Sequence, residues 1–319
     1  MRFWGTRGSL PSPGPETPRY GGNTSCIEVR AGEHLLIFDA GSGIRELGNR
    51  LLRDMPITAH VFFTHYHWDH IMGFPFFGPL FVPGNEINLY GETKDDQDVL
   101  QILKGQMRGP YFPVTMEQEA RSTLRSHELI PGSEVMVGDA RVTTCRLHHP
   151  NDALAFRIDH HGRAVVYATD IEHDPALDRP LIELCRGADA LIYDSTYTDT
   201  EYAGHIGWGH STWRAGVDIA KAAKVKQFII FHHLPERTDR EVAGIERAAR
   251  RVFPGAIAAR EGMELTYPAA ARVTSSARNG VKPAGKKASK KPARTATAPK
   301  KPATAKKATK KKAAKKARK

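Results

Sequence analysis

Cysteine is scarce in this 319-residue chain, and its three cysteines, Cys26, Cys145 and Cys185, are widely spaced. No Cys-x-x-Cys pair occurs, so the sequence indicates neither a disulfide framework nor a zinc site built from thiolates. Long apolar runs are lacking too, since none approaches the roughly 18 residues of a membrane-spanning helix. The N-terminal residues show no basic-then-apolar signal pattern. These absences predict a cytoplasmic protein without a membrane partner.

Acidic residues are absent from the last part of the chain. Residues 273–319 contain 18 of the 47 Lys and Arg residues and no Asp or Glu. The other 29 basic residues face 35 acidic ones, so the preceding body has a net charge of −6. The tail is rich in Lys, Ala and Pro and has no aromatic residue, and such composition predicts disorder. A polycation of this kind favours non-specific binding to nucleic-acid phosphates, although a solvated tail without a dedicated partner is the alternative.

Apolar, β-branched runs predict two blocks of strands, each followed by helices. We expect strands at CIEVR, HLLIFDAG, AHVFFT, INLYG, RVTTCRL, ALAFRID, RAVVYATD, ALIYD and QFIIF. We expect helices near 93–107, 178–186, 211–224 and 236–252. This order predicts an α/β fold in which two sheets pack face to face with helices outside. The predicted boundaries are one domain at 1–268 and a basic tail at 269–319.

The segment THYHWDH, residues 64–70, follows directly after an apolar run. His65 and His67 are two residues apart and therefore point to the same side of an extended segment. A tight turn would bring Asp69 and His70 to the same cavity. Imidazole and carboxylate suit Zn²⁺, Mn²⁺ or Fe²⁺, and four such ligands in one segment indicate two adjacent metals rather than one catalytic ion.

Further candidate ligands stand at the ends of other predicted strands. His148-His149 follows VTTCRL, Asp170 ends AVVYATD, and His232-His233 follows QFIIF. Within each histidine pair the residues alone leave the choice of ligand open. Three independent strand ends with ligand-type residues favour a metal site over an accidental crowding of histidines.

The chain resembles metallo-β-lactamase-fold hydrolases, and within them the phosphodiesterase branch with ribonuclease Z and small cyclic-phosphate phosphodiesterases. The resemblance covers about residues 1–268 and rests on GTRGSLPSPG, YGGNTSC, FDAGSG, THYHWDH, HHPNDALAFRI, YATDIEH, YDSTY, GWGHSTW and FHH. It implies a four-layer αββα sandwich. It also implies two divalent metal ions, with Zn²⁺ expected and Mn²⁺ or Fe²⁺ as alternatives.

The same resemblance implies a role for each residue. It assigns His65, His67 and His149 to the first metal, and Asp69, His70 and His232 to the second. Asp170 is expected to bridge both ions, and Asp39 to orient the ligand loop by hydrogen bonds. His149 is preferred to His148, and His232 to His233. The expected catalytic residues are Asp69, His210 and Asp194.

GWGHSTW favours phosphodiester chemistry over the amide and thioester chemistry of other members of the fold. Ser211 is a candidate N-cap for the following helix, and a helix start near the site favours an anionic phosphate. His210 is placed to protonate the leaving group after attack by a hydroxide that bridges the metals, and Asp194 is expected to fix its tautomer. A loop or helix cap is the other interpretation of Asp194.

The expected substrate is a small phosphodiester, a cyclic nucleotide or cyclic phosphate. The acidic body disfavours docking of a large RNA, and the segment between INLYG and VLQILKGQMRGPYFP has little of the Gly/Pro-rich, basic composition that the resemblance implies for the tRNA-binding arm of ribonuclease Z. Tyr111, Phe112, Tyr197 and Trp208 are candidates for stacking on a base. Ribonuclease Z-like processing of tRNA 3′ ends, hydrolysis of a thioester or lactam, and a non-catalytic nucleic-acid-associated protein are the alternatives. A homodimer is also expected from the resemblance.

Overall fold

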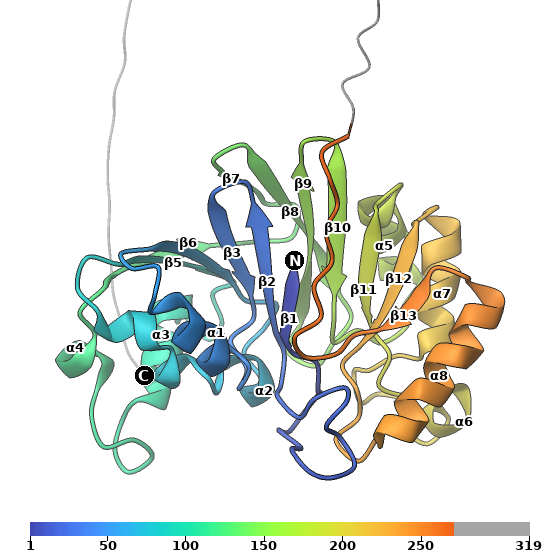
Figure 1. Ribbon diagram of the computed structural model, residues 1–319, viewed down its shortest axis with the longest axis horizontal. Coiled ribbons are helices and arrows are strands. Elements are labelled where there is room, and N and C mark those ends of the chain that lie inside the picture. The colour runs from blue at the N-terminus through green and yellow to red at the C-terminus, as the bar shows by residue number, and fades with distance from the viewer. Residues whose placement is uncertain (271–319) are drawn as a thin grey trace, which may run out of the picture. The chain divides into compact units, whose positions relative to one another are not determined.

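Two β-sheets form the centre of the fold, and helices cover their outer faces (Figure 1). The computed structural model describes residues 1–270, apart from the side chains of residues 175 and 176, so nearly all of the predicted basic tail lies outside the described residues. Within residues 1–270, no helix is long and apolar enough to cross a membrane.

The first sheet contains six strands in chain order. They are β1 (Arg2–Gly5), β2 (Cys26–Ala31), β3 (His34–Phe38), β4 (Thr58–Phe62), β5 (Glu86–Gly91) and β6 (Thr123–Glu128). β2 and β3 form the predicted hairpin, and β3 to β6 are parallel. β3 and β4 pair in register, with Phe38 opposite Phe62. Their carboxyl ends therefore meet at one edge of the sheet.

The second sheet contains seven strands, again in chain order. They are β7 (Glu134–Val137), β8 (Ala140–Leu147), β9 (Ala153–His160), β10 (Arg163–Ala168), β11 (Ala190–Asp194), β12 (Gln227–Phe231) and β13 (Ala256–Ala258). β7 to β10 are antiparallel to their neighbours, and β10 to β13 are parallel. β8, β10, β11 and β12 consequently end at the same edge.

Helices pack on the outer face of each sheet (Figure 1). They are α1 (Ile44–Leu51), α2 (Trp68–Ile71), α3 (Val99–Gln106), α4 (Met116–Glu119), α5 (Pro175–Cys185), α6 (Asp199–Tyr202), α7 (Trp213–Ala222) and α8 (Asp239–Val252), with 3₁₀ turns at Phe74–Phe76 and Gly78–Phe81. One apolar cluster underlies α1 and α3, and another underlies α5, α7 and α8. The predicted four-layer αββα sandwich is confirmed.

The third apolar cluster fills the space between the two sheets. Phe38 of β3 packs on Phe156 of β9, with ring centroids 5.4 Å apart, and on Tyr167 of β10. A backbone hydrogen bond from Leu154 to the carbonyl of Thr64 links the sheets at the edge where β4 ends. This edge carries the polar residues described next.

The predicted helix at 93–107 is wrong at its start. A short turn at Lys94–Gln97 precedes α3, and Asp98 is the N-cap, with its side chain accepting from the backbone N–H of Gln101. In return, the side chain of Gln101 accepts a hydrogen bond from the backbone N–H of Asp98. The two residues form a capping box, which marks the first turn of a helix. α3 therefore begins at Val99.

Candidate metal centre

Ligand-type residues lie just past the carboxyl ends of strands from both sheets. Asp39 follows β3, Asp170 follows β10, and His232 follows β12. All three have positive φ angles, of 60°, 56° and 59°. Non-glycine residues rarely adopt this left-handed conformation, and such strain is concentrated at functional sites. Here it turns the chain sharply as it leaves each sheet.

The first group consists of His65, His67 and His149, whose ligand atoms all lie within 4.8 Å of one another. Nε2 of His149 is 3.1 Å from Nδ1 of His67. Nδ1 of His149 lies 2.7 Å from the carbonyl oxygen of Gly209. Because a carbonyl only accepts, Nδ1 donates, and the lone pair of Nε2 is left for a cation.

The second group consists of four buried residues, Asp69, His70, Asp170 and His232. Oδ2 of Asp69 lies 3.1 Å from Nε2 of His70 and 3.2 Å from Nε2 of His232. The backbone N–H of Ser9 donates to the same oxygen at 2.8 Å. The N-terminal loop thus holds the Asp69 carboxylate in place.

Asp170 lies between the two groups and presents one oxygen to each. Its Oδ2 is 3.7 Å from Nε2 of both His65 and His149. Its Oδ1 is 3.1 Å from Nε2 of His70 and 3.2 Å from Nε2 of His232. This is the arrangement expected of a carboxylate shared by two cations.

Asp39 belongs to neither metal group and instead holds a candidate ligand in place by hydrogen bonds. Its carboxylate accepts from the backbone and hydroxyl of Thr64, the phenol of Tyr167 and Nδ1 of His70. The His70 contact is 2.8 Å and leaves Nε2 of that ring directed at Asp69 and Asp170. Asp39 therefore fixes the tautomer of a candidate ligand and joins both sheets.

The protonation states suit cation binding. Burial lowers the pKa of His65, of His67 and of His149, which keeps these rings neutral as ligation requires. Burial alone would raise the pKa of Asp170, but the imidazoles around it hold that pKa well below its usual range. Burial lowers the pKa of His70, but Asp170, Asp69 and Asp39 outweigh it and raise that pKa well above normal. The ionised carboxylates therefore stabilise a positive charge beside Nε2 of His70, either a proton on that ring or a cation in its place.

A buried ring nitrogen supports the presence of a metal. Nε2 of His65 is inaccessible to solvent and has no hydrogen-bond partner among the described residues, and Nε2 of His70 faces only the two carboxylates that a cation would share. A buried polar atom without a partner is costly unless something absent from the protein itself satisfies it. With neutral imidazoles and ionised carboxylates around them, the residues fit divalent cations.

The structure separates the two members of each histidine pair. His148 is exposed, whereas His149 is buried in the first group. His233 is buried, but its Nε2 donates to the carbonyl of Ala259, and burial lowers its pKa to about 3. The geometry therefore favours His149 and His232 as the ligands.

His210 and Asp194 lie beside the metal groups. Nδ1 of His210 is 2.9 Å from Oδ2 of Asp194 and 3.9 Å from Oδ2 of Asp170. Burial lowers the pKa of His210, but the Asp194 charge and hydrogen bond outweigh it and raise the pKa to about 9. Asp194 also accepts from the backbone and hydroxyl of Thr196, so it both caps a turn and orients His210.

Glu172 is a residue whose role the sequence did not reveal. Its buried carboxylate accepts from the backbone N–H groups of Gly207 at 2.6 Å and Gly209 at 2.9 Å, and from the phenol of Tyr202. Gly209 is the residue whose carbonyl orients His149, and it directly precedes His210. Glu172 thus holds the loop that positions both. The one indication in the sequence was that this acidic residue stands two positions after the candidate ligand Asp170.

The predicted N-cap at Ser211 is wrong. α7 begins at Trp213, and Thr212 is its N-cap, with a side chain that accepts from the N–H of Ala215. The hydroxyl of Ser211 is instead 3.0 Å from the phenol oxygen of Tyr193. Ser211 is fully buried and thereby anchors the end of the His210 loop to β11.

The aromatic candidates for stacking on a base have different environments. Tyr197 is buried and stacks on His205, so it belongs to the loop support. Phe112 packs edge-on against Phe76. Tyr111 and Trp208 are exposed. Two hollows border the metal groups, one lined by His65 and His67 and the other by His67, Asp170 and His210, and none of the four aromatic residues lines either of them.

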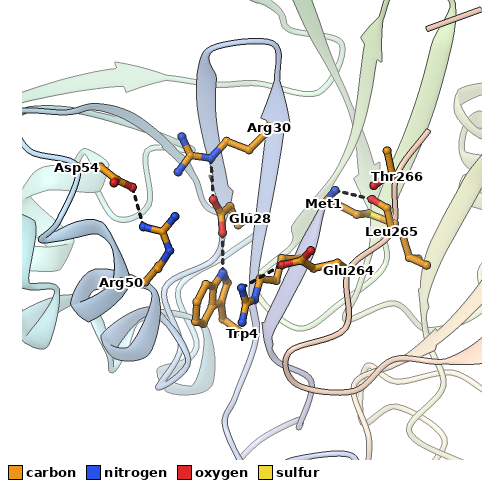
Figure 2. Close-up of a pocket in the computed structure, with 10 residues that line it drawn as sticks. Met1, Trp4, Glu28, Arg30, Arg50, Asp54, Glu264, Leu265 and Thr266 are labelled. Carbon is orange, nitrogen blue, oxygen red and sulfur yellow. Dashed lines mark hydrogen bonds and ion pairs between the residues drawn. The ribbon is translucent and has the colours of Figure 1, made fainter. Parts of the chain in front are cut away.

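Figure 2 shows a hollow of about 410 Å³ lined by Met1, Trp4, Glu28, Arg30 and other residues, none of which belongs to the metal groups. Its charged side chains are paired with each other. Arg50 contacts Asp54, and the carboxylate of Glu28 accepts from Arg30 and from the indole of Trp4. This hollow has no cluster of metal-ligating side chains, in contrast to the strand-end edge.

The chain resembles known proteins over most of the described residues. The family model described as Beta-lactamase superfamily domain matches residues 34–233. A protein named ribonuclease Z from Methanosarcina mazei is 28% identical, covering 83% of this chain and 97% of that protein. The metallo-beta-lactamase fold protein YhfI from Bacillus subtilis superposes with a TM-score of 0.62 at 20% identity, covering 82% of this chain and 96% of that one. The short form of human tRNase Z gives a TM-score of 0.60 at 20% identity, with coverage of 84% and 98%.

Proposed function

Because this chain belongs to the β-lactamase superfamily, we propose that it is a dinuclear metal-dependent hydrolase of phosphodiester bonds. The proposed substrates are small cyclic nucleotides or cyclic phosphates. His65, His67 and His149 would hold one ion, Asp69, His70 and His232 the other, and Asp170 both. Zn²⁺ is the proposed metal, with Mn²⁺ and Fe²⁺ as alternatives that the same ligand types accept.

Divalent cations at this position would activate a water molecule and neutralise the charge on the phosphate oxygens. The protein's own residues supply orientation and a proton. The Ser9 N–H fixes Asp69, the Gly209 carbonyl fixes His149, and Asp39 fixes His70. With ligands held in this way, little reorganisation is needed when a substrate binds.

The position of His210 is the observation that carries the proposal. Its ring lies next to Asp170 and is held by Asp194, and its pKa of about 9 keeps it protonated at neutral pH. A protonated imidazole donates its proton to the alkoxide oxygen that leaves phosphorus. In hydrolysis of a thioester the leaving thiolate needs no such proton, so a protonated histidine at this place favours a phosphodiester over a thioester.

Ribonuclease Z-like cleavage of tRNA is the second candidate, favoured by the name of the relative that covers 83% of this chain. Against it stands the net charge of −6 in the body, which repels a large polyanion. A basic tail that binds nucleic acid and a homodimer also stay predictions.

A substrate panel tests the proposal. Metal-analysed, full-length protein is assayed against bis(p-nitrophenyl) phosphate, 2′,3′- and 3′,5′-cyclic nucleotides, precursor tRNA, a thioester and a lactam. We expect hydrolysis of the small phosphodiesters. Activity confined to precursor tRNA would favour the second candidate, and activity confined to the thioester or lactam would refute both.

A matched pair of variants tests the ligand assignment. His149→Ala should lose bound metal and hydrolysis, whereas His148→Ala should keep both, because only His149 lies in the buried group. Metal content measured by mass spectrometry and turnover of bis(p-nitrophenyl) phosphate are compared for the two proteins. Equal behaviour of the pair would show that the first group is assigned incorrectly.

A further inference from the structure

Trp68 is the first residue of α2 and has 79% of its surface exposed. The next three residues of this short helix are buried, so the turn that directs Asp69 and His70 inward necessarily directs residue 68 outward. That geometry explains the exposure but does not explain the choice of tryptophan. Any polar side chain would satisfy an outward position at lower cost in exposed apolar surface.

The other three tryptophans all have partners. Trp4 donates to Glu28, Trp208 packs edge-on against His205, and Trp213 lies beneath the guanidinium of Arg214. Within residues 1–270, the indole of Trp68 makes no hydrogen bond, ring contact or cation–π contact. Its large flat face is therefore free beside the metal groups.

Trp68 lines a hollow of about 410 Å³ that opens onto the second metal group. The residues that line it are Ser9, Tyr66, His67, Trp68, Asp69, Asp170 and His210. This volume is within the range of small-ligand sites. A phosphate held beside Asp69 and Asp170 would place its ester arm on the His210 side within the same hollow as the indole.

A second hollow of about 500 Å³ is lined by His65 and His67 and by residues of segments 94–102 and 151–152. Tyr66 and His67 line both hollows, so the two adjoin at the metal groups. The second hollow is lined by charged side chains, among them Lys94 and Asp152, and its one aromatic ring is the half-buried Tyr66, whose phenol donates to the carbonyl of Glu92. The largely exposed indole of Trp68 lines only the hollow on the His210 side, which therefore offers the larger surface for stacking of a base.

Resting on the proposed phosphodiesterase function, we propose that Trp68 stacks on the nucleobase of the substrate. The substrates are then nucleoside phosphodiesters whose base lies on the same side of the phosphate as His210. Every base has a π face, so all four bases should be accepted. Purines should be moderately preferred to pyrimidines because their larger rings stack more strongly. Trp68 would thus be a specificity residue.

The test compares substrates with and without a base. For the full-length protein, kcat/KM is measured on 2′,3′-cyclic AMP and on glycerol 1,2-cyclic phosphate, and their ratio is calculated. Trp68→Ala should lower this ratio about five- to a hundredfold, the range found when a stacking aromatic is removed. Trp68→Phe should restore most of it. Tyr111→Ala is the control, since Tyr111 is 80% exposed but lines neither hollow.

Binding provides a readout that does not require turnover. AMP should quench the tryptophan fluorescence of the wild-type protein, and Trp68→Phe should remove the quenching. If the wild type hydrolyses no phosphodiester, the proposed function fails, whereas retained quenching that depends on Trp68 would still support the stacking site. An unchanged substrate ratio in Trp68→Ala, or an equal loss on both substrates, would overturn the stacking proposal.

Discussion

His210, which is partly exposed, pairs with the buried Asp194, and Nδ1 of the ring lies 2.9 Å from Oδ2 of the carboxylate. Asp194 is fully buried, and its Oδ1 is occupied by the backbone and hydroxyl of Thr196. Nδ1 of His210 therefore carries a hydrogen directed at Asp194, and Nε2 is the nitrogen left to exchange a proton with a substrate.

Replacing Asp194 by Asn tests this pair through the pH dependence of hydrolysis. Asp194 raises the pKa of His210 to about 9, so the acid form persists below that pH and is lost above it. Asn removes the charge, and the pKa of His210 falls because the largest of the contributions that raise it is lost. The alkaline limb of the kcat profile should move to lower pH, with metal content unchanged. An alkaline limb that stays at the wild-type pH would show that His210 is not the acid.

Gly8→Ala should weaken metal binding although Gly8 is no ligand. A methyl group at this position would lie 2.3 Å from Cε1 of the His232 ring, and the loop cannot retreat freely because the Gly8 N–H donates to the carbonyl of His233. Displacing a ligand ring in this way should cost about 10- to 100-fold in metal affinity, as loss of supporting contacts does elsewhere. Affinity is measured by competition with a chelating dye.

Gly14→Ala is the matched control for Gly8→Ala. It lies in the same N-terminal loop, and a methyl group there would contact nothing within 4 Å. Its metal affinity should equal that of the wild type. A similar loss in both variants would point to general disturbance of the loop.

Glu172→Gln should slow turnover because Gln can no longer accept all three hydrogen bonds that hold the Gly207–Gly209 loop. We expect kcat to fall about 10- to 100-fold with a smaller change in KM, since the loop that positions His210 and the Gly209 carbonyl that orients His149 lose their anchor. Glu183→Gln is the control, because Glu183 is exposed and its carboxylate contacts Arg186, away from the metal groups. A loss that appears only in KM would contradict a positioning role.

Cutting the chain after Ala270 should leave hydrolysis of small substrates intact and abolish salt-sensitive retention of DNA. The removed residues contain the 18 Lys and Arg of segment 273–319, and the remaining body has an excess of acidic residues. Retention is measured on immobilised DNA between low and moderate salt. Loss of small-substrate hydrolysis would show that the domain boundary near 268 is misplaced.

The regular elements with strong apolar runs could be predicted from the sequence, and the weak ones could not. β10, β11 and β12 are buried runs of five or six residues and were expected within two residues of their observed bounds. β1, β6, β7 and β13 were missed. β6 reads TLRSHE with no buried residue, and β1, β7 and β13 have only three or four residues each, so none of them offers a sustained apolar run.

The candidate metal residues could be named because each follows a predicted strand, but their supports could not. Ser9, Glu172 and Tyr167 act on residues far along the chain, and only the folded arrangement brings them to Asp69, Gly209 and Asp39. The error at Ser211 has a different cause. Ser and Thr are both good N-caps and adjoin here, so local preference cannot distinguish them.

The two metal groups draw their members from both sheets, since His65 to His70 follow β4 whereas His149, Asp170 and His232 follow strands of the other sheet. A cation held by both sets fastens the two halves of the sandwich across their common edge. Such ions would stabilise the fold as well as take part in hydrolysis. Removal of the ions by a chelator should therefore weaken the contact between the sheets before either sheet unfolds. The melting temperature of the protein should be higher with its metals bound than without them.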